Sequence, residues 1–255
     1  MNHRLAAATA RLGLTCLLML NCTAQAGELT VLSGNGARAA VTELAAQFER
    51  ASGHKVTVHF DVNPDVKRKV EAGAAFDVLV LNPPVLDELI RQGHVLPVTR
   101  AMIGRAGIGA AVRAGTPLPD ISTVEAFRRT LLGVRSVAYP GEGASGKYFV
   151  SVVERLGITD QMRTTMRPMP AEYNVEVVAR GEVDLVVVVA SRVAGVAGVT
   201  LIGPIPQELP TWIGFAAGVG SRANAPDAAR ALVRFLTAPA AAPVLRSLGV
   251  EPFVE

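Results

Sequence analysis

Short apolar runs alternate with longer amphipathic segments along most of the chain. The run Leu29–Leu32 ends in a glycine-rich turn, which predicts a strand. From Arg38 to Arg50, apolar residues recur with the spacing of one helix face, which predicts an amphipathic helix. The same order is repeated by predicted strands at 56–60 and 77–81 and by predicted helices at 63–73 and 83–93. The helix at 63 opens with Asn63 as a capping residue, followed by proline and a carboxylate.

A second series of the same kind follows. Its predicted strands are 136–139 and 184–189, its predicted helices are 145–156 and 172–180, and two more helices, 226–236 and 243–248, end the chain. Alternating strands and helices are typical of parallel sheets covered by helices. The segments 108–118 and 200–206 are interpreted as crossovers between two units. We therefore predict an α/β fold with two lobes, the first formed by 27–107 plus 204–255 and the second by 108–203.

The N-terminal segment 1–26 has the features of a secretory signal peptide. Two arginines precede a short apolar run, and Ala24–Ala26 forms a cleavage pattern of small residues, which predicts a cut after Ala26. The run is too short to cross a bilayer, which requires about 20 apolar residues. A buried first helix and a lipid anchor at Cys22 are the alternatives; Asn21 before this cysteine disfavours the anchor. We expect a periplasmic protein.

Removal of the signal peptide changes the cysteine content and the net charge of the chain. It removes both cysteines of the chain, Cys16 and Cys22, so the mature protein is expected to have no disulfide. It also removes two arginines and so lowers the formal net charge of +3 by two. No run of lysine or arginine indicates nucleic-acid binding. The four histidines form no zinc pattern, and no nucleophile elbow is present. We expect a monomer with no metal and no cofactor.

Four loops follow predicted strands and lead into predicted helices. They are 33–38, 61–65, 139–148 and 170–174. In open α/β sheets, ligands bind beyond the carboxyl ends of the strands, and helix N-termini attract anions. The predicted ligand-binding residues are Asn35, Gly36, Arg38, Asn63, Ser145, Gly146, Lys147 and Tyr173. The alternative is that these are ordinary loops whose small polar residues only make turns and caps.

The loop 139–148 carries the most specific signal for an anion. It places three glycines beside Ser145, which can cap the helix or offer its hydroxyl group, and Lys147 adds a positive charge. Arg38 occupies an equivalent position after the first glycine turn. Both cations suit a carboxylate or a phosphate, although a single lysine or arginine is more often a solvated surface residue.

The segment Gly34–Ala39 also fits the outline of a dinucleotide-binding fingerprint. It has the order G-x-G-x-x-A after a strand, and Asp61 ends the next strand. The match is short, and export argues against a nicotinamide cofactor. We therefore favour an anion site.

Several segments resemble the type 2 periplasmic binding proteins, in particular their molybdate-binding branch. They are 29–32, 44–48, 70–73, 76–80, 136–139, 144–146, 178–185 and 235–239, and the resemblance extends over nearly all of the mature chain. The resemblance implies two lobes, each a mainly parallel sheet flanked by helices, with the ligand in the cleft between them. It also implies delivery of a small anion to an ABC-type permease.

The molybdate-binding pattern is broken at three positions. That branch has a ligand serine after the first strand, a serine-rich turn after the second and a ligand tyrosine late in the chain. This chain has Gly36, Val62–Pro64 and Val189 there. A buried oxyanion that lacks its hydrogen bonds is destabilised by roughly 1–3 kcal/mol per bond. The changes favour a ligand other than molybdate or tungstate.

The same branch is similar to aconitate isomerases, which interconvert trans- and cis-aconitate without a cofactor. Such an allylic proton shift needs a positioned acid or base. The candidates are Tyr148, Lys147, Glu142 and Glu172, and the sequence does not decide among them. The first hypothesis is therefore a protein that binds a di- or tricarboxylate, and the second is an aconitate isomerase.

Overall fold

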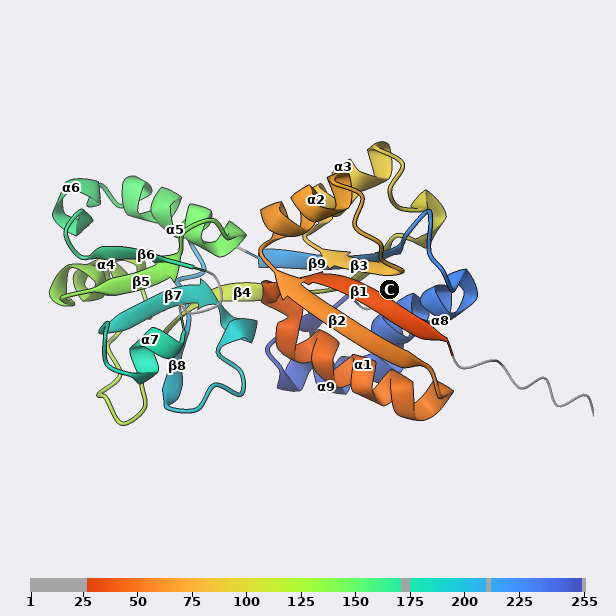
Figure 1. Cartoon of the computed structure of the whole chain (residues 1–255). Helices are drawn as coiled ribbons and strands as arrows, with labels where there is room; N and C mark the ends of the chain where they lie inside the picture. Colours follow the sequence, from red (N-terminus) through yellow and green to blue (C-terminus); the bar gives the residue numbers. More distant parts are fainter. Residues whose placement is uncertain (1–26, 171–174, 210–211, 254–255) are drawn as a thin grey trace, which may run out of the picture.

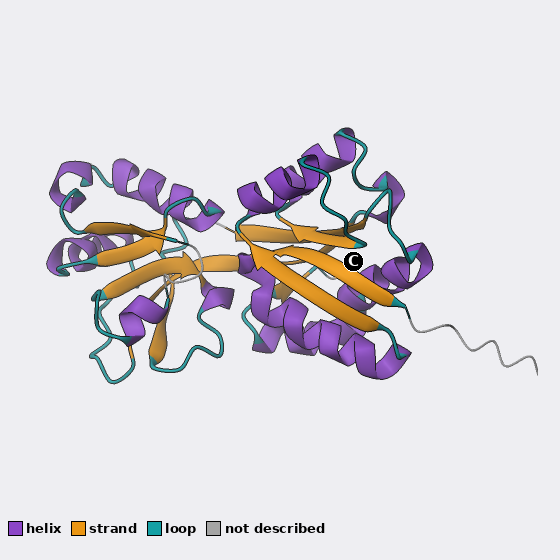
Figure 2. Cartoon of the chain, in the orientation of Figure 1, coloured by secondary structure: helices purple, strands orange, loops and turns teal. Residues whose placement is uncertain are grey.

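Two α/β lobes lie next to each other and share one long strand, β4 (Ala101–Arg113) (Figure 1). The computed structural model describes residues 27–170, 175–209 and 212–253. Strands form the centre of each lobe and helices cover them (Figure 2). The predicted fold class, two lobes with sheets flanked by helices, is confirmed. The predicted signal peptide lies outside the described residues.

Lobe 1 is built from both ends of the described chain. Its elements are β1 (Glu28–Gly34), η1 (Asn35–Ala37), α1 (Arg38–Ser52), β2 (Lys55–Asp61), α2 (Asn63–Glu71), β3 (Val78–Leu81), α3 (Pro83–Arg91), η2 (Pro97–Thr99), β9 (Trp212–Val219), α8 (Pro226–Thr237), η4 (Pro239–Ala241), α9 (Ala242–Ser247) and β10 (Glu251–Pro252). The strand order is β2-β1-β3-β9-β4. The first three strands are parallel, whereas β9 is antiparallel to both β3 and β4.

Apolar side chains cover both faces of this sheet, as the continuous apolar run of β3 predicts. Leu79 and Leu81 pack with α2 and α3, whereas Val78 and Val80 pack with α1, α8 and α9. Figure 1 shows these two groups of helices on opposite sides of the strands. Successive residues of a strand point to opposite faces, so an all-apolar strand requires cover on both.

Lobe 2 is built from the middle of the chain. Its elements are α4 (Val124–Gly133), β5 (Val137–Pro140), α5 (Ala144–Arg155), α6 (Thr159–Met162), β6 (Met166–Met169), α7 (Glu176–Ala179), β7 (Leu185–Val189), η3 (Ala190–Arg192) and β8 (Val199–Pro204). The order β4-β7-β5-β6 continues the sheet, and β8 pairs with β4. One face of β7 packs with α4, α5 and α6. Its other face belongs to the core cluster that also contains α1 and α8, so the two lobes share part of their packing.

Strands occupy most of the two predicted crossovers, and the sequence pattern did not predict these strands. The strand β4 pairs with β9 from Ala101 to Gly107 and with β7 from Ile108 to Ala111. The predicted crossover at 200–206 is occupied up to Pro204 by β8. Glycines weaken the strand signal of β4, but close packing requires them. A Cβ atom at Gly104 would lie 2.5 Å from the carbonyl oxygen of Glu251. The exact lobe boundaries remain a prediction.

The helices α2 and α5 contain the residues that the sequence predicts to cap them, and both starts lie at the inter-lobe site described below. Asn63 is the first residue of α2 rather than its cap, since the N-cap is Val62 and no side chain caps this helix. Ser145 likewise lies inside α5, whose N-cap is Gly143. The predicted helix 172–180 is observed as α7, from Glu176 to Ala179; residues 171–174 lie outside the described residues.

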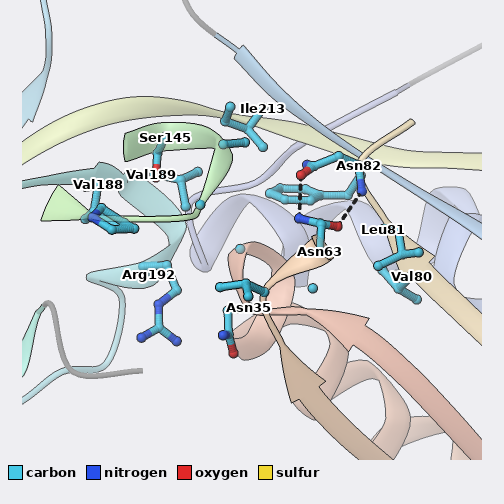
Figure 3. A pocket seen from close by; sticks show the side chains of 17 residues that line it. Asn35, Asn63, Val80, Leu81, Asn82, Ser145, Val188, Val189, Arg192 and Ile213 are labelled. Carbon is cyan, nitrogen blue, oxygen red and sulfur yellow. Dashed lines mark hydrogen bonds between the residues drawn. The ribbon is translucent and has the colours of Figure 1, made fainter. Parts of the chain in front are cut away.

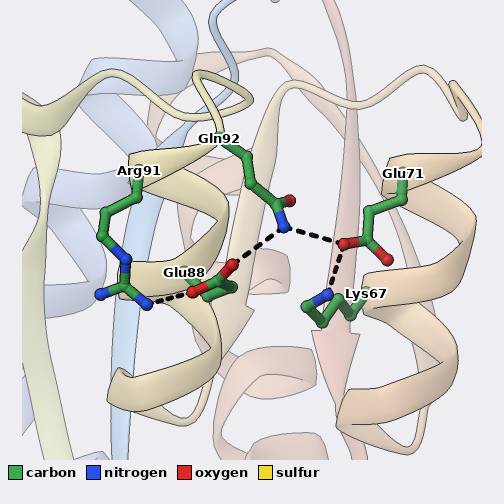
Figure 4. A network of polar contacts seen from close by, with 5 residues as sticks. All are labelled: Lys67, Glu71, Glu88, Arg91 and Gln92. Carbon is green, nitrogen blue, oxygen red and sulfur yellow. Dashed lines mark hydrogen bonds and ion pairs between the residues drawn. The ribbon is translucent and has the colours of Figure 1, made fainter.

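A surface network fixes α2 against α3, the two helices on one face of lobe 1 (Figure 4). Gln92 donates to Glu71 at 2.9 Å and to Glu88 at 3.0 Å. Lys67 binds Glu71 and Arg91 binds Glu88, and these bonds lower the pKa of both carboxyls. The network therefore stabilises the fold above the usual carboxyl pKa and is lost as the pH falls through the lowered values.

Gly146→Ala should destabilise the protein by about 1–3 kcal/mol through overpacking. A Cβ atom at Gly146 would lie 1.6 Å from the carbonyl oxygen of Pro140, so α5 would have to move away from β5. Gly133→Ala is the matched control, because a Cβ atom there meets nothing within 4 Å. Urea unfolding of the three proteins measures the difference. Equal midpoints for the two variants would contradict the expectation.

Candidate functional site

An inner pocket of about 50 Å³ lies where the two lobes meet. Its walls come from the carboxyl ends of β1, β2, β3, β5 and β7, from the helix starts that follow them, and from β9. The lining residues are Gly34, Asn35, Gly36, Val62, Asn63, Val80, Leu81, Asn82, Pro140, Gly143, Ala144, Ser145, Val188, Val189, Arg192, Ile213 and Phe215. Figure 3 shows side chains from both lobes facing this space. The location agrees with the rule for ligand sites in open α/β sheets.

Four helix N-termini converge on the inner pocket without a capping side chain. Their N-cap residues are Gly34, Val62, Asn82 and Gly143, all of which line the pocket, and none makes a side-chain cap bond. Missing caps are not special to these helices: α4 is capped by the Thr123 hydroxyl, which accepts from the Ala126 N–H at 3.1 Å, whereas α6, α8 and α9 start away from the pocket and also have no side-chain cap. The first N–H groups of a helix lack partners within the helix, so the pocket collects backbone donors and positive dipole ends.

The described polar side chains of the pocket are also suited to anions. They are three asparagine amides, the hydroxyl of Ser145 and the guanidinium of Arg192. Ser145 is 5% exposed, and its hydroxyl has no hydrogen-bond partner among the described residues. Arg192 is the charged side chain in this described lining, and it follows β7 in η3. A guanidinium binds carboxylates with two parallel hydrogen bonds.

Asn63 and Asn82 form a paired unit on one wall (Figure 3). The Asn63 amide nitrogen donates to Asn82 Oδ1 at 2.5 Å, and the Asn82 backbone N–H donates to Asn63 Oδ1 at 3.0 Å. The Asn82 amide nitrogen also donates to the carbonyl oxygen of Gly214 at 2.8 Å. The pair therefore links the starts of α2 and α3 to the strand β9.

Arg38, predicted to bind the ligand, does not line the inner pocket. Its guanidinium donates to Asn35 Oδ1 at 2.6 Å and lies over the Phe60 ring, 4.4 Å from the centroid. Asn35 is 7% exposed and does line the pocket. The structure therefore gives Arg38 the role of holding Asn35 in place.

Gly36, also predicted, lies where the lobes touch. The Ser191 hydroxyl, from η3, donates to the Gly36 carbonyl oxygen at 2.7 Å. A Cβ atom at Gly36 would lie 2.8 Å from Cε1 of Phe215. Glycine is therefore required for close packing against β9, which gives a physical reason for its presence where the molybdate-binding pattern has a serine.

The predicted residues of α5 are distributed over several environments. Ser145 lines the inner pocket. Gly146 is buried against Pro140 and is not part of the pocket lining. Lys147 is exposed outside the pocket lining. The Tyr148 hydroxyl donates to the Leu209 carbonyl oxygen at 2.6 Å, and its ring packs in the core of lobe 2. These placements do not support a direct contact of Lys147 or Tyr148 with a ligand in the inner pocket.

An outer cavity adjoins the inner pocket through Val62 and contains Glu142, another predicted acid or base. It measures about 550 Å³ and is lined by Asp61, Val62, Asp65, Gly141, Glu142, Pro168, Met169 and Pro170. Partial burial raises the pKa of Asp61, but hydrogen bonds from Lys69 and from the Val62 N–H leave it below its usual value. Lys69 and Arg68 form ion pairs with Asp61 and Asp65, which reduces the repulsion of an entering anion.

The predicted residues Glu172 and Tyr173 lie outside the described residues. Sequence reasoning missed two polar side chains that line the inner pocket, those of Asn82 and Arg192. A signal for both was present, because each follows a predicted strand and so falls at a carboxyl end. Asn82 also repeats the Asn-Pro pair of Asn63, directly after the strand 77–81. No group of three or more potential metal-binding side chains occurs within 27–170, 175–209 and 212–253.

Comparisons with known proteins agree on one family. Residues 29–251 match the family described as bacterial extracellular solute-binding protein. An aconitate isomerase from Pseudomonas sp is 32% identical over 230 residues, which are 88% of this chain and 87% of that protein. A molybdate-binding protein from Azotobacter vinelandii is 26% identical over 241 residues, 91% of this chain and 92% of that protein.

Solved structures support the fold. The Azotobacter vinelandii periplasmic molybdate-binding protein superposes with a TM-score of 0.77 at 19% identity, covering 89% of this chain and 100% of that one. Among the described residues no single helix has the length and apolar character of a membrane span; α8 with the following η4–α9 segment meets the criterion only as a pair bent by 56°.

Proposed function

Because the chain belongs to the bacterial extracellular solute-binding proteins, we propose that it binds a small carboxylate anion, a di- or tricarboxylate, between its lobes in the periplasm. It would act as a monomer and deliver this anion to an ABC-type permease after removal of its signal peptide. The observation that carries the proposal is the convergence of four uncapped helix N-termini on the inner pocket.

A carboxylate fits the donors of this pocket better than a tetrahedral oxyanion does. Arg192 supplies a planar, charged fork that matches a carboxylate, while the wall at Gly36 and Val189 lacks the hydroxyl groups of the molybdate-binding pattern. The amides of Asn63 and Asn82 add neutral donors on the opposite side. These features support a ligand with more than one carboxylate, each meeting donors on a different wall.

The size of the inner pocket supports a mechanism in which the lobes separate. The inner pocket, at about 50 Å³, is well below the roughly 300–1,000 Å³ of typical ligand pockets. A tricarboxylate therefore enters only when the lobes move apart, and closure then surrounds it. The bond from Ser191 to the Gly36 carbonyl must break or shift during this motion.

Ligand-dependent stability tests the proposal. The mature protein should show a higher melting temperature with millimolar trans-aconitate or citrate, because a ligand that binds only the native state stabilises it. Sulfate and molybdate serve as tetrahedral anions for comparison, and tricarballylate as a saturated tricarboxylate. A shift with molybdate alone would contradict a carboxylate ligand, and no shift with any anion would contradict the anion site.

The second candidate is an aconitate isomerase, favoured by the 32% identity to that enzyme over most of both chains. The reaction removes a proton from the substrate methylene carbon, moves the double bond and returns a proton to the former vinyl carbon. This requires a group that can take up and release a proton. The described lining of the inner pocket offers amides, a hydroxyl and a guanidinium, which bind anions and are poor bases near neutral pH.

Proton NMR in deuterated buffer separates the two candidates. A binding protein leaves trans-aconitate unchanged, whereas an isomerase forms cis-aconitate and introduces deuterium. If turnover occurs, Glu172→Gln, Tyr173→Phe and Glu142→Gln are the first variants, with Lys147→Ala and Tyr148→Phe as the remaining candidates. An unchanged spectrum over hours together with a thermal shift would support binding without catalysis.

A further inference from the structure

Asn82 occupies a constrained position at the junction of the pocket and β9. It is the N-cap of α3 but does not cap the helix with its side chain, and it is 9% exposed. Its side chain instead meets Asn63 and Gly214, as described above. This side chain joins the end of β3 to the strand β9. Burying a polar side chain lowers the stability of the fold unless its hydrogen bonds are made.

The hydrogen bonds determine which way both amides face. Asn82 Oδ1 accepts from the Asn63 amide, and Asn63 Oδ1 accepts from the Asn82 backbone N–H, at 2.5 Å and 3.0 Å. A flip of either amide would bring two acceptors or two donors together. Each amide nitrogen has two hydrogens, and for each nitrogen one hydrogen has no acceptor among the described residues.

We propose that Asn82, oriented by Asn63 and Gly214, contacts the bound anion and is a specificity-determining residue of the pocket. The paired amides offer hydrogen-bond donors to the pocket, while their oxygens are occupied. An ionised carboxylate, which only accepts, is matched to these donors. Each amide oxygen already accepts one hydrogen bond, so a hydroxyl or a protonated carboxyl group, which must also donate, is matched less well. The inference rests on the proposed anion site and adds to it the selection of the ionised form.

The first test is calorimetric titration of the mature protein with trans-aconitate at pH 7.5. Asn82→Ala should weaken binding roughly 10- to 100-fold, the effect of losing a hydrogen bond to a charged group. Asn224→Ala is the matched control, since Asn224 is exposed at the far end of lobe 1 and does not line the pocket. Asn63→Ala should have a similar effect to Asn82→Ala, and the double variant should lose less than the product of the two.

The second test separates ligand contact from a purely structural role. Asn82→Asp keeps the shape but places a carboxylate where the amide donor was, so binding at pH 8 should fall at least roughly 100-fold relative to the wild type. Burial beside the Gly214 carbonyl oxygen should raise the pKa of the introduced carboxyl above that of a free aspartate, so lowering the pH to 5.5 protonates part of it. This restores a donor, and the ratio to the wild type at the same pH should shrink. A purely structural role predicts that the melting temperature without ligand falls and recovers with pH in parallel with the affinity, because the protonated carboxyl also restores the bond to Gly214.

The outcomes distinguish the two levels of the proposal. Wild-type affinity in both Asn82→Ala and Asn82→Asp would overturn the role of Asn82 and leave the anion site intact. If Asn82→Asp does not fold, the comparison of Asn82→Ala with Asn224→Ala decides, with the melting temperature of each protein without ligand measured beside it. A wild-type protein that binds neither trans-aconitate, citrate nor sulfate would overturn the anion site and the role of Asn82 together.

Discussion

Replacing Arg192 by alanine should weaken the binding of trans-aconitate or citrate roughly 100-fold and leave the fold intact. Arg192 brings a full positive charge to the lining of the inner pocket from η3, at the end of β7. Arg192 is half-buried, and closure of the lobes around the ligand would enclose the charge pair further. Removing one partner of an enclosed, hydrogen-bonded charge pair costs about 2–5 kcal/mol, and about 2.8 kcal/mol corresponds to 100-fold. Calorimetric titration gives the affinity, and the melting temperature without ligand shows whether the variant remains folded.

Lys147→Ala is the matched control for this variant, because it removes an equal charge from an exposed residue outside the inner pocket. We expect its affinity to stay within about threefold of the wild type, since exposed charges are screened by solvent and salt. Arg192→Lys should recover only part of the affinity, because an ammonium lacks the planar fork. A larger loss in Lys147→Ala than in Arg192→Ala would place the ligand on the outer side of α5.

The comparison of these two cations shows what the sequence reveals about the site. The sequence predicts Lys147 as a ligand-binding residue because it follows a glycine-rich turn. In the structure it is the fourth residue of α5, and its side chain is exposed. Arg192 has no glycine-rich surroundings in the sequence; its signal is its place after the predicted strand 184–189, and the position of β7 within the sheet brings it to the pocket. The helix-start rule identifies three loops that line the inner pocket, 33–38, 61–65 and 139–148. It missed the helix start at Asn82, and residues 171–174 of the fourth predicted loop lie outside the described residues. Which way a side chain faces one turn into a helix depends on the helix orientation.

The elements themselves were easier to predict than the connections between the lobes. The strands β1, β2 and β3 and the helices between them follow strong apolar periodicity and lie within a few residues of the prediction. The strand β4 was missed because its glycines and alanines give a weak strand pattern. Its conformation is imposed by pairing with β9, β7 and β8, which are distant in sequence, and local propensity cannot report such pairing.

The capping prediction for Asn63 failed for an informative reason. Asparagine before proline is a common helix cap, and local sequence alone favours that role. In the structure the Asn63 side chain bonds to Asn82 instead, and the helix start at Val62 has no side-chain cap. A ligand anion can bind the free N–H groups at this helix start. Because α6, α8 and α9, which start away from the pocket, also have no side-chain cap, the convergence of several helix starts, rather than the missing caps, indicates the binding site.

Ala144→Asp tests this idea, with opposite effects on stability and on binding. Ala144 is the first residue of α5 and lines the inner pocket, and α5 has no side-chain cap. A carboxylate in the first helical turn should stabilise the protein without ligand by about 0.5 kcal/mol through the helix dipole. The same charge should repel a ligand carboxylate about 4 Å away by about 4 kcal/mol, which weakens binding about 1,000-fold.

Ala144→Asn is the control, because it has nearly the same shape without the charge and should retain affinity within about tenfold. Urea unfolding without ligand and titration with trans-aconitate measure the two effects on the same protein samples. Binding to Ala144→Asp should also recover partly at high salt, since screening shortens the range of the repulsion. If Ala144→Asp bound trans-aconitate as tightly as Ala144→Asn, the start of α5 would not face the ligand, and the convergence of helix N-termini would lose its functional meaning.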